Sequence, residues 1–447
     1  MVANLAEHLH QHSHYHHRQS AAAGQASMAE SSSGSHGVLS LGLLVLAPIS
    51  IVLFHTTMHQ LDGSVQKLWL ELMYEGVVGF FVQMWPQFTN LQLWACIFSF
   101  FLLQFTLIKL IPATTRYGPF TPAGNSPVYY ENGLIAYILT VVLFCCGAQL
   151  GLYNGGVLYD NLGPFLTAMN IVSLVLSLIM YLKALFAPSN TDTKRLELHP
   201  SFLGVDLKHF FITRISVMYW GVFGISALFK QRQLYSTNSD ALLVNVFLQL
   251  VYILKFYFFE RGFFGSIDAK ENRVGFYQIW RALAFVPSLY TSHTAYLVPH
   301  LRSLGVPACI FLCTLGLFCI YSTFKIDRQR HRFRESGGKC KIWDKDPFFM
   351  TARVQTTSGD VKSALILGSG WWGMAHHLNY LPELGVAVCW TIPVLSRQLL
   401  PYAYPVYLAG YLYDRAHRDN ARCHQKYGKT WDIYSKKVPY MFLPGIW

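Results

Sequence analysis

Apolar runs long enough to cross a bilayer recur along the whole chain, separated by polar segments. A helix needs about 20 apolar residues to span a ~30 Å hydrocarbon core, so each run predicts one span. The runs are Val38–Phe54, Leu91–Ile111, Leu134–Leu152, Phe165–Phe186, Ile215–Phe229, Ala241–Phe259, Phe276–Val298, Val306–Phe324 and, more broken, Gly385–Tyr413. The pattern predicts an all-α, polytopic transmembrane bundle of nine or ten spans, since the last run can hold two.

Three connections are longer and more polar, at 187–208, 325–363 and 415–447. Within the second, residues 351–362 predict a small β-hairpin around Ser358–Gly359. Residues 1–36 are rich in His and Ser and are typical of a disordered tail. Because His-rich tracts also bind metal, that alternative stays open.

Composition supports a membrane protein. Of the 447 residues, 53% are hydrophobic and only 13% are charged, where soluble domains carry about 25%. The formal net charge of +12 lies mostly between apolar runs, which fits charge beside membrane spans better than nucleic-acid binding. The nine cysteines lack metal-ligand spacing, so we expect neither a disulfide framework nor a zinc site.

Polar side chains at membrane depth are candidates for function. Glu260 ends a strongly apolar run, beside Arg261 and eight residues before Asp268. Burial raises the pKa of an unpaired carboxyl group, so Glu260 or Asp268 is a candidate acid. The alternative is that Glu260 and Arg261 only mark the end of a helix.

Residues 371–384, WWGMAHHLNYLPEL, combine aromatic, imidazole, amide and carboxyl groups. His376 and Tyr380 share a helical face, as do Asn379 and Glu383. His376 and Glu383 lie two turns apart, too far for a mononuclear metal site without a third ligand. Hydrogen bonding to a nucleotide suits this mixture better.

The charged stretch at 327–347 carries arginines, including Arg330 and Arg334, whose forked guanidinium groups suit phosphate. A solvated cytoplasmic loop near anionic lipid is the alternative. No Gly-x-Gly-x-x-Gly follows a strand, so a dinucleotide is not expected to bind in the Rossmann manner.

Read together, these segments resemble the sterol reductase family of the endoplasmic reticulum, and within it the plant-type sterol Δ7-reductases (7-dehydrocholesterol reductases). The likeness runs from about residue 38 to 447. It is carried by TPAGNSPVYYENGLIAY (121–137), LLVNVFLQLVYILKFYFFE (242–260), VGFYQIW (274–280), FRESGGKCKIW (333–343), SGWWGMAHHLNYLPE (369–383) and RDNARCHQKYGKTWDIYSKKVPYMFLPGIW (418–447).

The resemblance implies two membrane parts: a sterol-side bundle at 37–300, and an NADPH-binding half at 301–447 that folds like isoprenylcysteine carboxyl methyltransferases. It implies NADPH as cofactor and a sterol entering from lipid. It assigns Glu260, Asp268 and Tyr290 to catalysis. The implied cofactor-binding residues are Arg330, Arg334, Trp343, Trp371, Trp372, His377, Asn379, Tyr380, Glu383, Arg418, Asp419, Arg422, Cys423, Lys426 and Tyr427.

The chain departs from the family pattern at several positions. His376 stands where Arg is usual, and Asp344 to Pro347 replace a Gly-Arg-Lys-Pro run. Glu271 and Asn272 replace a His-Asp pair after Asp268. Arg281 and Ala282 replace a Gly-Asp or Gly-Cys pair. These changes fall at both the cofactor side and the sterol side.

An isolated sterol double bond does not attract hydride, so the reaction implied begins with protonation and ends with hydride transfer from NADPH. A buried Glu260 or Asp268 is the expected acid, with Tyr277 or Tyr290 as a relay. The function expected is reduction of the C7–C8 double bond of Δ5,7-sterols in the endoplasmic reticulum membrane, with other sterol-biosynthetic enzymes as possible partners. The alternatives are a C14-reductase, a decayed sterol-binding relative and a membrane methyltransferase.

Overall fold

The computed structural model describes residues 42, 44–118, 127–186, 199–264, 266, 275–355 and 361–446. The chain divides into two compact units, 1–51 and 52–447, and the helices and strands numbered below belong to the second. Its helices are α2 (Val65–Met84), α3 (Leu91–Leu110), α4 (Gly133–Gln149), α5 (Val157–Asp160), α6 (Leu162–Phe186), α7 (Leu207–His209), α8 (Val217–Tyr235), α9 (Asp240–Phe258), α10 (Glu260–Phe264), α12 (Phe276–Trp280), α13 (Val286–Leu289), α14 (Ser292–Leu297), α15 (Val306–Glu335), α16 (Tyr380–Thr391), α17 (Ala403–Tyr427) and α18 (Lys429–Lys437).

Five helical stretches in the described part of the chain are long and apolar enough to cross a membrane. They are Leu91–Leu110, Leu162–Phe186, Leu207–Tyr235, Asp240–Phe258 and Val306–Glu335. Shorter apolar helices cover Leu44–His59, Gly133–Gln149 and Tyr380–Val394. The chain is therefore a multi-pass, mainly helical membrane protein, whereas the total of nine or ten spans stays a prediction.

Two of the predicted spans are divided. The run 276–298 consists of α12, the π-helix η2 (Arg281–Phe285), α13 and α14. The run 385–413 is shared between α16 and α17. A second π-helix, η1 (Phe210–Ser216), leads into α8 and packs against η2. π-helical turns are rare and are frequent at functional sites.

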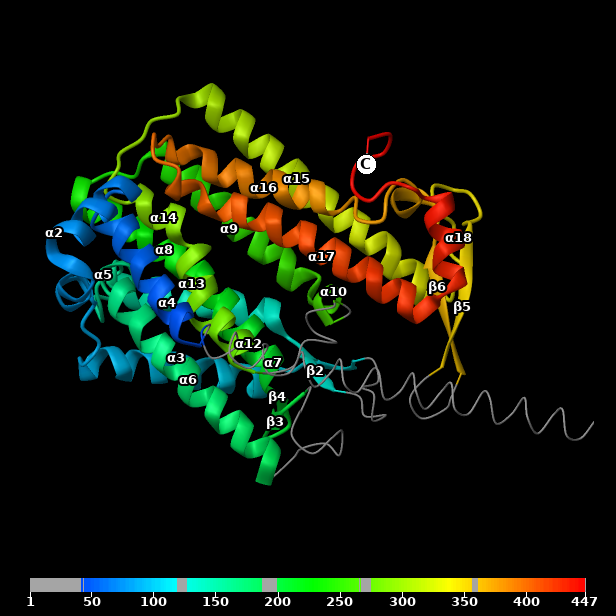
Figure 1. Cartoon of the computed structure of the whole chain (residues 1–447), viewed down its shortest axis with the longest axis horizontal. Helices are drawn as coiled ribbons and strands as arrows, with labels where there is room; N and C mark the ends of the chain where they lie inside the picture. The colour runs from blue at the N-terminus through cyan, green and yellow to red at the C-terminus, as the bar shows by residue number, and fades with distance from the viewer. Residues whose placement is uncertain are drawn as a thin grey trace, which may run out of the picture. The chain divides into compact units, whose positions relative to one another are not determined.

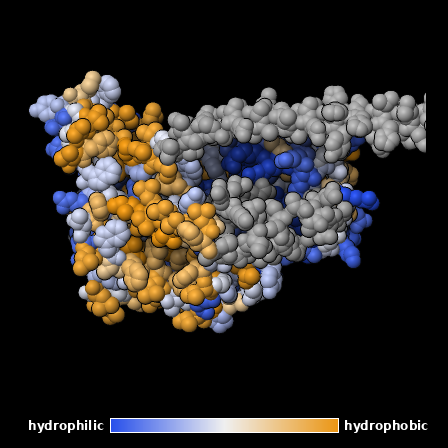
Figure 2. All heavy atoms as spheres, turned by 60° about the horizontal axis from the view of Figure 1, so that its bottom comes forward, coloured by the Kyte–Doolittle hydropathy of each residue, from blue (hydrophilic) through white to orange (hydrophobic). Residues whose placement is uncertain are grey.

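Lipid-facing side chains explain the low charge of the chain. On α6, Leu174, Leu178 and Phe186 are exposed, as are Phe98 and Leu102 on α3. Figure 2 shows apolar residues covering much of this side of the molecule, whereas hydrophilic residues gather toward the opposite end. An apolar outer face is what a hydrocarbon solvent requires.

The helices α9, α15, α16 and α17 run side by side, packed in part around the buried Trp390 (Figure 1). A buried polar network joins α9 to α14 and α16. The Asn245 amide donates to the Trp390 carbonyl at 2.6 Å, and the Gln249 amide donates to Asn245 Oδ1 at 2.7 Å. The Thr294 hydroxyl donates to the same Asn245 oxygen at 2.8 Å. Polar groups in a bilayer must find partners within the protein, so this network fixes how α9, α14 and α16 meet.

Three antiparallel strand pairs complete the described structure: β1 (Thr114–Tyr117) with β2 (Val128–Glu131), β3 (Ser201–Phe202) with β4 (Val205–Asp206), and β5 (Phe349–Gln355) with β6 (Val361–Leu367). The last pair, in which Ala352 faces Ala364, confirms the predicted hairpin. Its turn at Ser358–Gly359 lies outside the described residues. The strand β5 packs against α17 and α18 and closes one end of the bundle (Figure 1).

Candidate active site

A cavity of about 710 Å³ extends between the helices α9, α15, α16 and α17 and the two π-helices. One part of its wall is apolar and aromatic, from η1, α8, α9, η2 and α13. The other part is charged, from α15, α17 and the segment before α16. Charged groups in the wall include the arginines Arg281, Arg330, Arg334, Arg415 and Arg422, the lysines Lys255 and Lys426, and the carboxyl groups of Asp327, Glu383 and Asp419.

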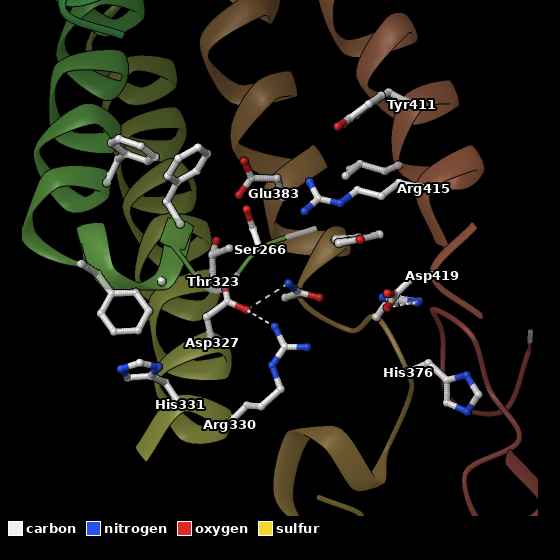
Figure 3. A pocket seen from close by; sticks show the side chains of 18 of the residues that line it. Ser266, Thr323, Asp327, Arg330, His331, His376, Glu383, Tyr411, Arg415 and Asp419 are labelled. Carbon is white, nitrogen blue, oxygen red and sulfur yellow. Dashed lines mark hydrogen bonds and ion pairs between the residues drawn. The ribbon is translucent and has the colours of Figure 1, made fainter. Parts of the chain in front are cut away.

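At the charged end, Arg330 and Arg334 occupy one face of α15, because residues four apart share a helix face. The Arg330 guanidinium carbon lies 3.8 Å from the centre of the Trp372 indole ring. Its Nη2 lies 3.8 Å from Asp327 Oδ1, and Asp327 also accepts from the Asn379 amide at 3.1 Å (Figure 3). The guanidinium plane is thereby held in place at the cavity wall.

The Gly/Trp-rich turn is anchored to α15. Gly370 has φ 63°, and a Cβ there would lie 2.4 Å from Gln329 Oε1, so this position requires glycine. Gln329 accepts from the Trp371 backbone N–H at 2.9 Å, and the Trp372 indole donates to the Ile326 carbonyl at 3.0 Å. Trp372 lines the cavity, and its contact with a cofactor stays a prediction.

Two other residues that the resemblance assigned to cofactor binding, Trp343 and Trp371, lie beside the cavity and not in its wall. Trp371 packs edge-on against Trp343, with ring centres 5.2 Å apart, and the lining residues of the described chain include neither. Trp343 is 55% exposed. These two tryptophans therefore support the turn beside the cavity, and contact with a cofactor stays a prediction for both.

His377 lies against the cavity, buried and stacked on Tyr380 with ring centres 4.8 Å apart. Its Nε2 is 3.7 Å from Asp419 Oδ2. Burial first, and then the charges of Arg330 and Arg415, lower its pKa to about 3. His377 is therefore neutral at physiological pH, and can act as a hydrogen-bonding group there without adding charge.

On α17, the cavity wall follows one stripe of the helix. Tyr411, Arg415 and Asp419 succeed one another along it (Figure 3). The stripe continues through Arg422, Cys423, Lys426 and Tyr427. Burial raises the pKa of the Cys423 thiol to about 12, so this group stays protonated. Arg418, also predicted to bind cofactor, instead pairs with Asp414 at 2.7 Å and is not among the lining residues.

At the other end, aromatic side chains surround one hydrogen-bonded pair. The Tyr252 hydroxyl donates to Glu383 Oε1. Tyr252 lies edge-on to Trp390 with ring centres 5.3 Å apart, and Tyr290 packs against Tyr404 at 4.6 Å. The resemblance assigned Tyr290 to catalysis and Glu383 to cofactor binding, whereas sequence reasoning missed Tyr252. Its position inside the apolar run 241–259 was the available signal, since a tyrosine hydroxyl at membrane depth needs a partner.

Glu260 does not lie in this wall. It is 1% exposed, and its Oε1 lies 2.9 Å from Arg214 Nη2 and 3.1 Å from His209 Nε2. Its other oxygen accepts from the Gly133 backbone N–H at 2.9 Å. A Cβ at position 133 would lie 2.2 Å from Arg214 Nη1, so only glycine admits this cluster.

The prediction that burial keeps Glu260 protonated is wrong. Burial alone raises the pKa of the carboxyl group, but Arg214, His209 and the Gly133 N–H together outweigh it and hold the pKa below the usual 4.5. An ionised, fully paired carboxylate has no proton to donate. Asp268 and the departures Glu271 and Asn272 lie outside the described residues.

Comparison with known proteins decides the family. Residues 38–447 match the model of the ergosterol biosynthesis ERG4/ERG24 family. The chain belongs to this family. It is 38% identical to a 7-dehydrocholesterol reductase of Arabidopsis thaliana, over 91% of the chain and 96% of the relative. It is 31% identical to a 7-dehydrocholesterol reductase of Danio rerio, over 90% of each chain. A Delta(14)-sterol reductase of Methylotuvimicrobium alcaliphilum is also 31% identical, over 78% of the chain and 82% of the relative.

Membership in this sterol reductase family suggests why the cavity has one charged end and one aromatic end. Sterol reduction requires a hydride donor and an apolar substrate at one place. The charged end and the aromatic end of the cavity are continuous. The match of residues 38–447 confirms the family assignment predicted from the sequence. The groups that line this cavity are therefore the candidates for its chemistry.

Proposed function

We propose that this protein is an NADPH-dependent sterol reductase of the endoplasmic reticulum membrane that reduces the C7–C8 double bond of Δ5,7-sterols. The observation that carries the proposal is the continuity of one cavity between a cluster of guanidinium groups and an apolar, aromatic chamber. The names of the relatives from Arabidopsis thaliana and Danio rerio support the Δ7 substrate over the Δ14 substrate.

The charged end fits a phosphorylated dinucleotide. Arg330, Arg334 and Arg422 offer forked donors for phosphate, and the aromatic rings of Trp372 and Tyr427 offer flat apolar surface. NADPH bound there would supply the hydride. The protein's part is to orient the cofactor and to exclude water from the reacting carbons.

We assign the donation of the proton to the Tyr252–Glu383 pair. Of the three carboxyl groups among the described lining residues, Asp327 contacts Arg330 and Asn379, and Asp419 lies near His377. Glu383 is the one hydrogen-bonded to a tyrosine beside the aromatic chamber. Tyr252 gives its proton to the double bond, and a proton from solvent returns to Tyr252 through Glu383. Bound NADPH would supply the hydride that the resulting sterol cation needs.

The test of the function is expression in yeast that accumulates ergosta-5,7-dienols, followed by sterol analysis. We expect Δ5 sterols to appear. Purified protein in detergent should also bind NADPH saturably, and S-adenosylmethionine should not compete. Products reduced only at C14 would transfer the proposal to that double bond. Sterol binding without any product would indicate a decayed, non-catalytic relative.

Arg330 and Arg334 should determine the preference for NADPH over NADH. A charge-assisted hydrogen bond contributes roughly 1.5–3 kcal/mol, so each alanine variant should weaken NADPH binding about 10- to 100-fold while NADH binding changes little. Isothermal titration with both cofactors measures this. Arg418→Ala is the matched control, because Arg418 pairs with Asp414 away from the cavity wall. An unchanged NADPH/NADH ratio in both variants would refute the phosphate assignment.

A further inference from the structure

The outward face of α15 carries a row of exposed side chains that the proposed reaction does not use. Residues three or four apart lie on the same side of a helix. The members of this outer row follow that spacing and are Phe318, Tyr321, Lys325, Arg328 and Arg332. The outer row therefore changes from aromatic to cationic at one level of the helix.

The cations of the outer row face away from the cavity. A helix turns by about 100° per residue, so Arg330 lies about 160° around the helix from Arg328, and Arg334 lies about 160° from Arg332. Arg330 and Arg334 line the cavity, whereas the described lining residues include no cation of the outer row. Two opposite faces of α15 thus carry two separate groups of positive charge.

The cations of the outer row pack on aromatic rings and not on carboxylates. The Lys325 Nζ lies 5.2 Å from the centre of the Tyr321 ring, and the Arg328 guanidinium carbon lies 5.5 Å from that of Phe324. Within the described part of the chain, no carboxylate forms an ion pair with any of the three cations: the neighbouring Glu335 lies 3.1 Å from His331 Nε2 and 3.7 Å from Arg261 Nη1. A ring face stabilises a cation without neutralising its charge, so the outer row presents three positive charges to its surroundings.

The surface next to these cations is apolar on two neighbouring helices. Phe318 on α15 and Phe258 at the end of α9 are both exposed. The helices α9 and α15 pack side by side, and the Phe258 ring centre lies 6.0 Å from that of Phe324. Tyr321 stands between the apolar and the cationic parts of the outer row, and tyrosine is enriched where hydrocarbon meets headgroups. The order of groups along this surface is therefore that of one leaflet of a bilayer.

We propose that the outward face of α15 binds an anionic phospholipid, whose headgroup is held by Lys325, Arg328 and Arg332. Its acyl chains lie along Phe318 and Phe258. Guanidinium groups take phosphate oxygens in a forked geometry, and anionic phospholipids are concentrated in the cytoplasmic leaflet. The site needs neither sterol nor NADPH, so this inference is independent of the proposed function. A lipid bound there holds α15 at a fixed depth in the bilayer.

The test compares an anionic with a zwitterionic phospholipid. Purified protein in detergent is titrated with dioleoyl-phosphatidylserine or, separately, with dioleoyl-phosphatidylcholine, and native mass spectrometry gives the Kd of the first lipid bound. Each basic residue near an anionic surface strengthens attachment about fivefold, so the native protein should bind phosphatidylserine about 10- to 100-fold more tightly than phosphatidylcholine. In a variant that combines Lys325→Gln, Arg328→Gln and Arg332→Gln, the two lipids should bind almost equally.

The matched control replaces three exposed lysines of α18, Lys429, Lys436 and Lys437, with glutamine. It removes the same charge as the α15 variant and should keep the native preference for phosphatidylserine. If the triple α15 variant does not fold, Arg328→Gln and Arg332→Gln are tested singly, and each should lower the preference about fivefold. An unchanged preference in the α15 variants would overturn the inference, and so would an equal loss in the α18 control, which would show an effect of net charge alone. A preference abolished by inorganic phosphate would also overturn it, since the ligand would then be a soluble anion.

Discussion

Replacing Tyr252 with phenylalanine should reduce kcat by about 10²- to 10⁴-fold, the usual contribution of a positioned acid. The substitution removes one hydroxyl group and leaves the ring that packs against Trp220 and Trp390. NADPH affinity should not change, since the charged end of the cavity is untouched. Steady-state turnover of 7-dehydrocholesterol by purified protein, with NADPH binding measured on the same preparation, gives both quantities.

Two further variants make the result specific. Glu383→Gln should lose activity to a similar degree, because the amide cannot return a proton to Tyr252. Tyr219→Phe is the matched control: Tyr219 is buried on α8, stacked on Phe165, and is not a lining residue. If Tyr252→Phe keeps native kcat, the donor lies elsewhere, and Tyr290 becomes the group to test.

Apolar runs predicted much of the fold because a helix that crosses lipid needs a long stretch of apolar residues, and such a stretch is visible in the sequence. The segments 91–111, 165–186, 241–259 and 306–324 correspond to α3, α6, α9 and α15. The helix α2 was not predicted as a span. It nevertheless exposes apolar side chains, including Met73 and Tyr74, as the predicted spans do. Glu71 and Glu75 interrupt its apolar run, and Gly76, with φ 69°, breaks the helix.

The charged end of the site was easier to predict than the aromatic end, of which the sequence indicated Tyr290 but not Tyr252. Arginine clusters such as Arg330 with Arg334 show their chemistry in the sequence, whereas a tyrosine in an apolar run resembles a core residue. What selects Tyr252 is the approach of Glu383, 131 positions later in the chain. Such a pairing depends on how α9 and α16 meet, which no local pattern reveals.

Glu260 illustrates the opposite error. The sequence shows a carboxyl group at the end of an apolar run, and this alone suggested an acid. Its three partners come from distant segments: Arg214 from η1, His209 from α7 and the first residue of α4, Gly133. A buried cation beside a carboxyl group favours the ionised form of that group. The burial that suggested a protonated acid from the sequence here also strengthens the ion pair.

Replacing Glu260 with glutamine should therefore destabilise the fold and not the chemistry. Breaking a buried ion pair from one side leaves Arg214, which is fully buried, without its counter-charge. The cost is about 3–5 kcal/mol in the free energy of unfolding, seen as a lower Tm and a smaller folded fraction in detergent. The molecules that remain folded should bind NADPH with native affinity and turn over sterol at the native rate per folded molecule.

A double variant separates structure from catalysis. Arg214→Met combined with Glu260→Met removes both charges, and replacing a buried pair by apolar groups is often close to neutral for stability. The double variant should thus be more stable than Glu260→Gln and should retain turnover. Since a carboxyl group with a lowered pKa contributes stability above its unfolded pKa and loses it as pH falls, the native protein should also lose more stability below pH 4.5 than the double variant does. A stable, folded Glu260→Gln that binds NADPH but reduces no sterol would return Glu260 to the mechanism, because only a chemical role leaves the fold intact while stopping the reaction.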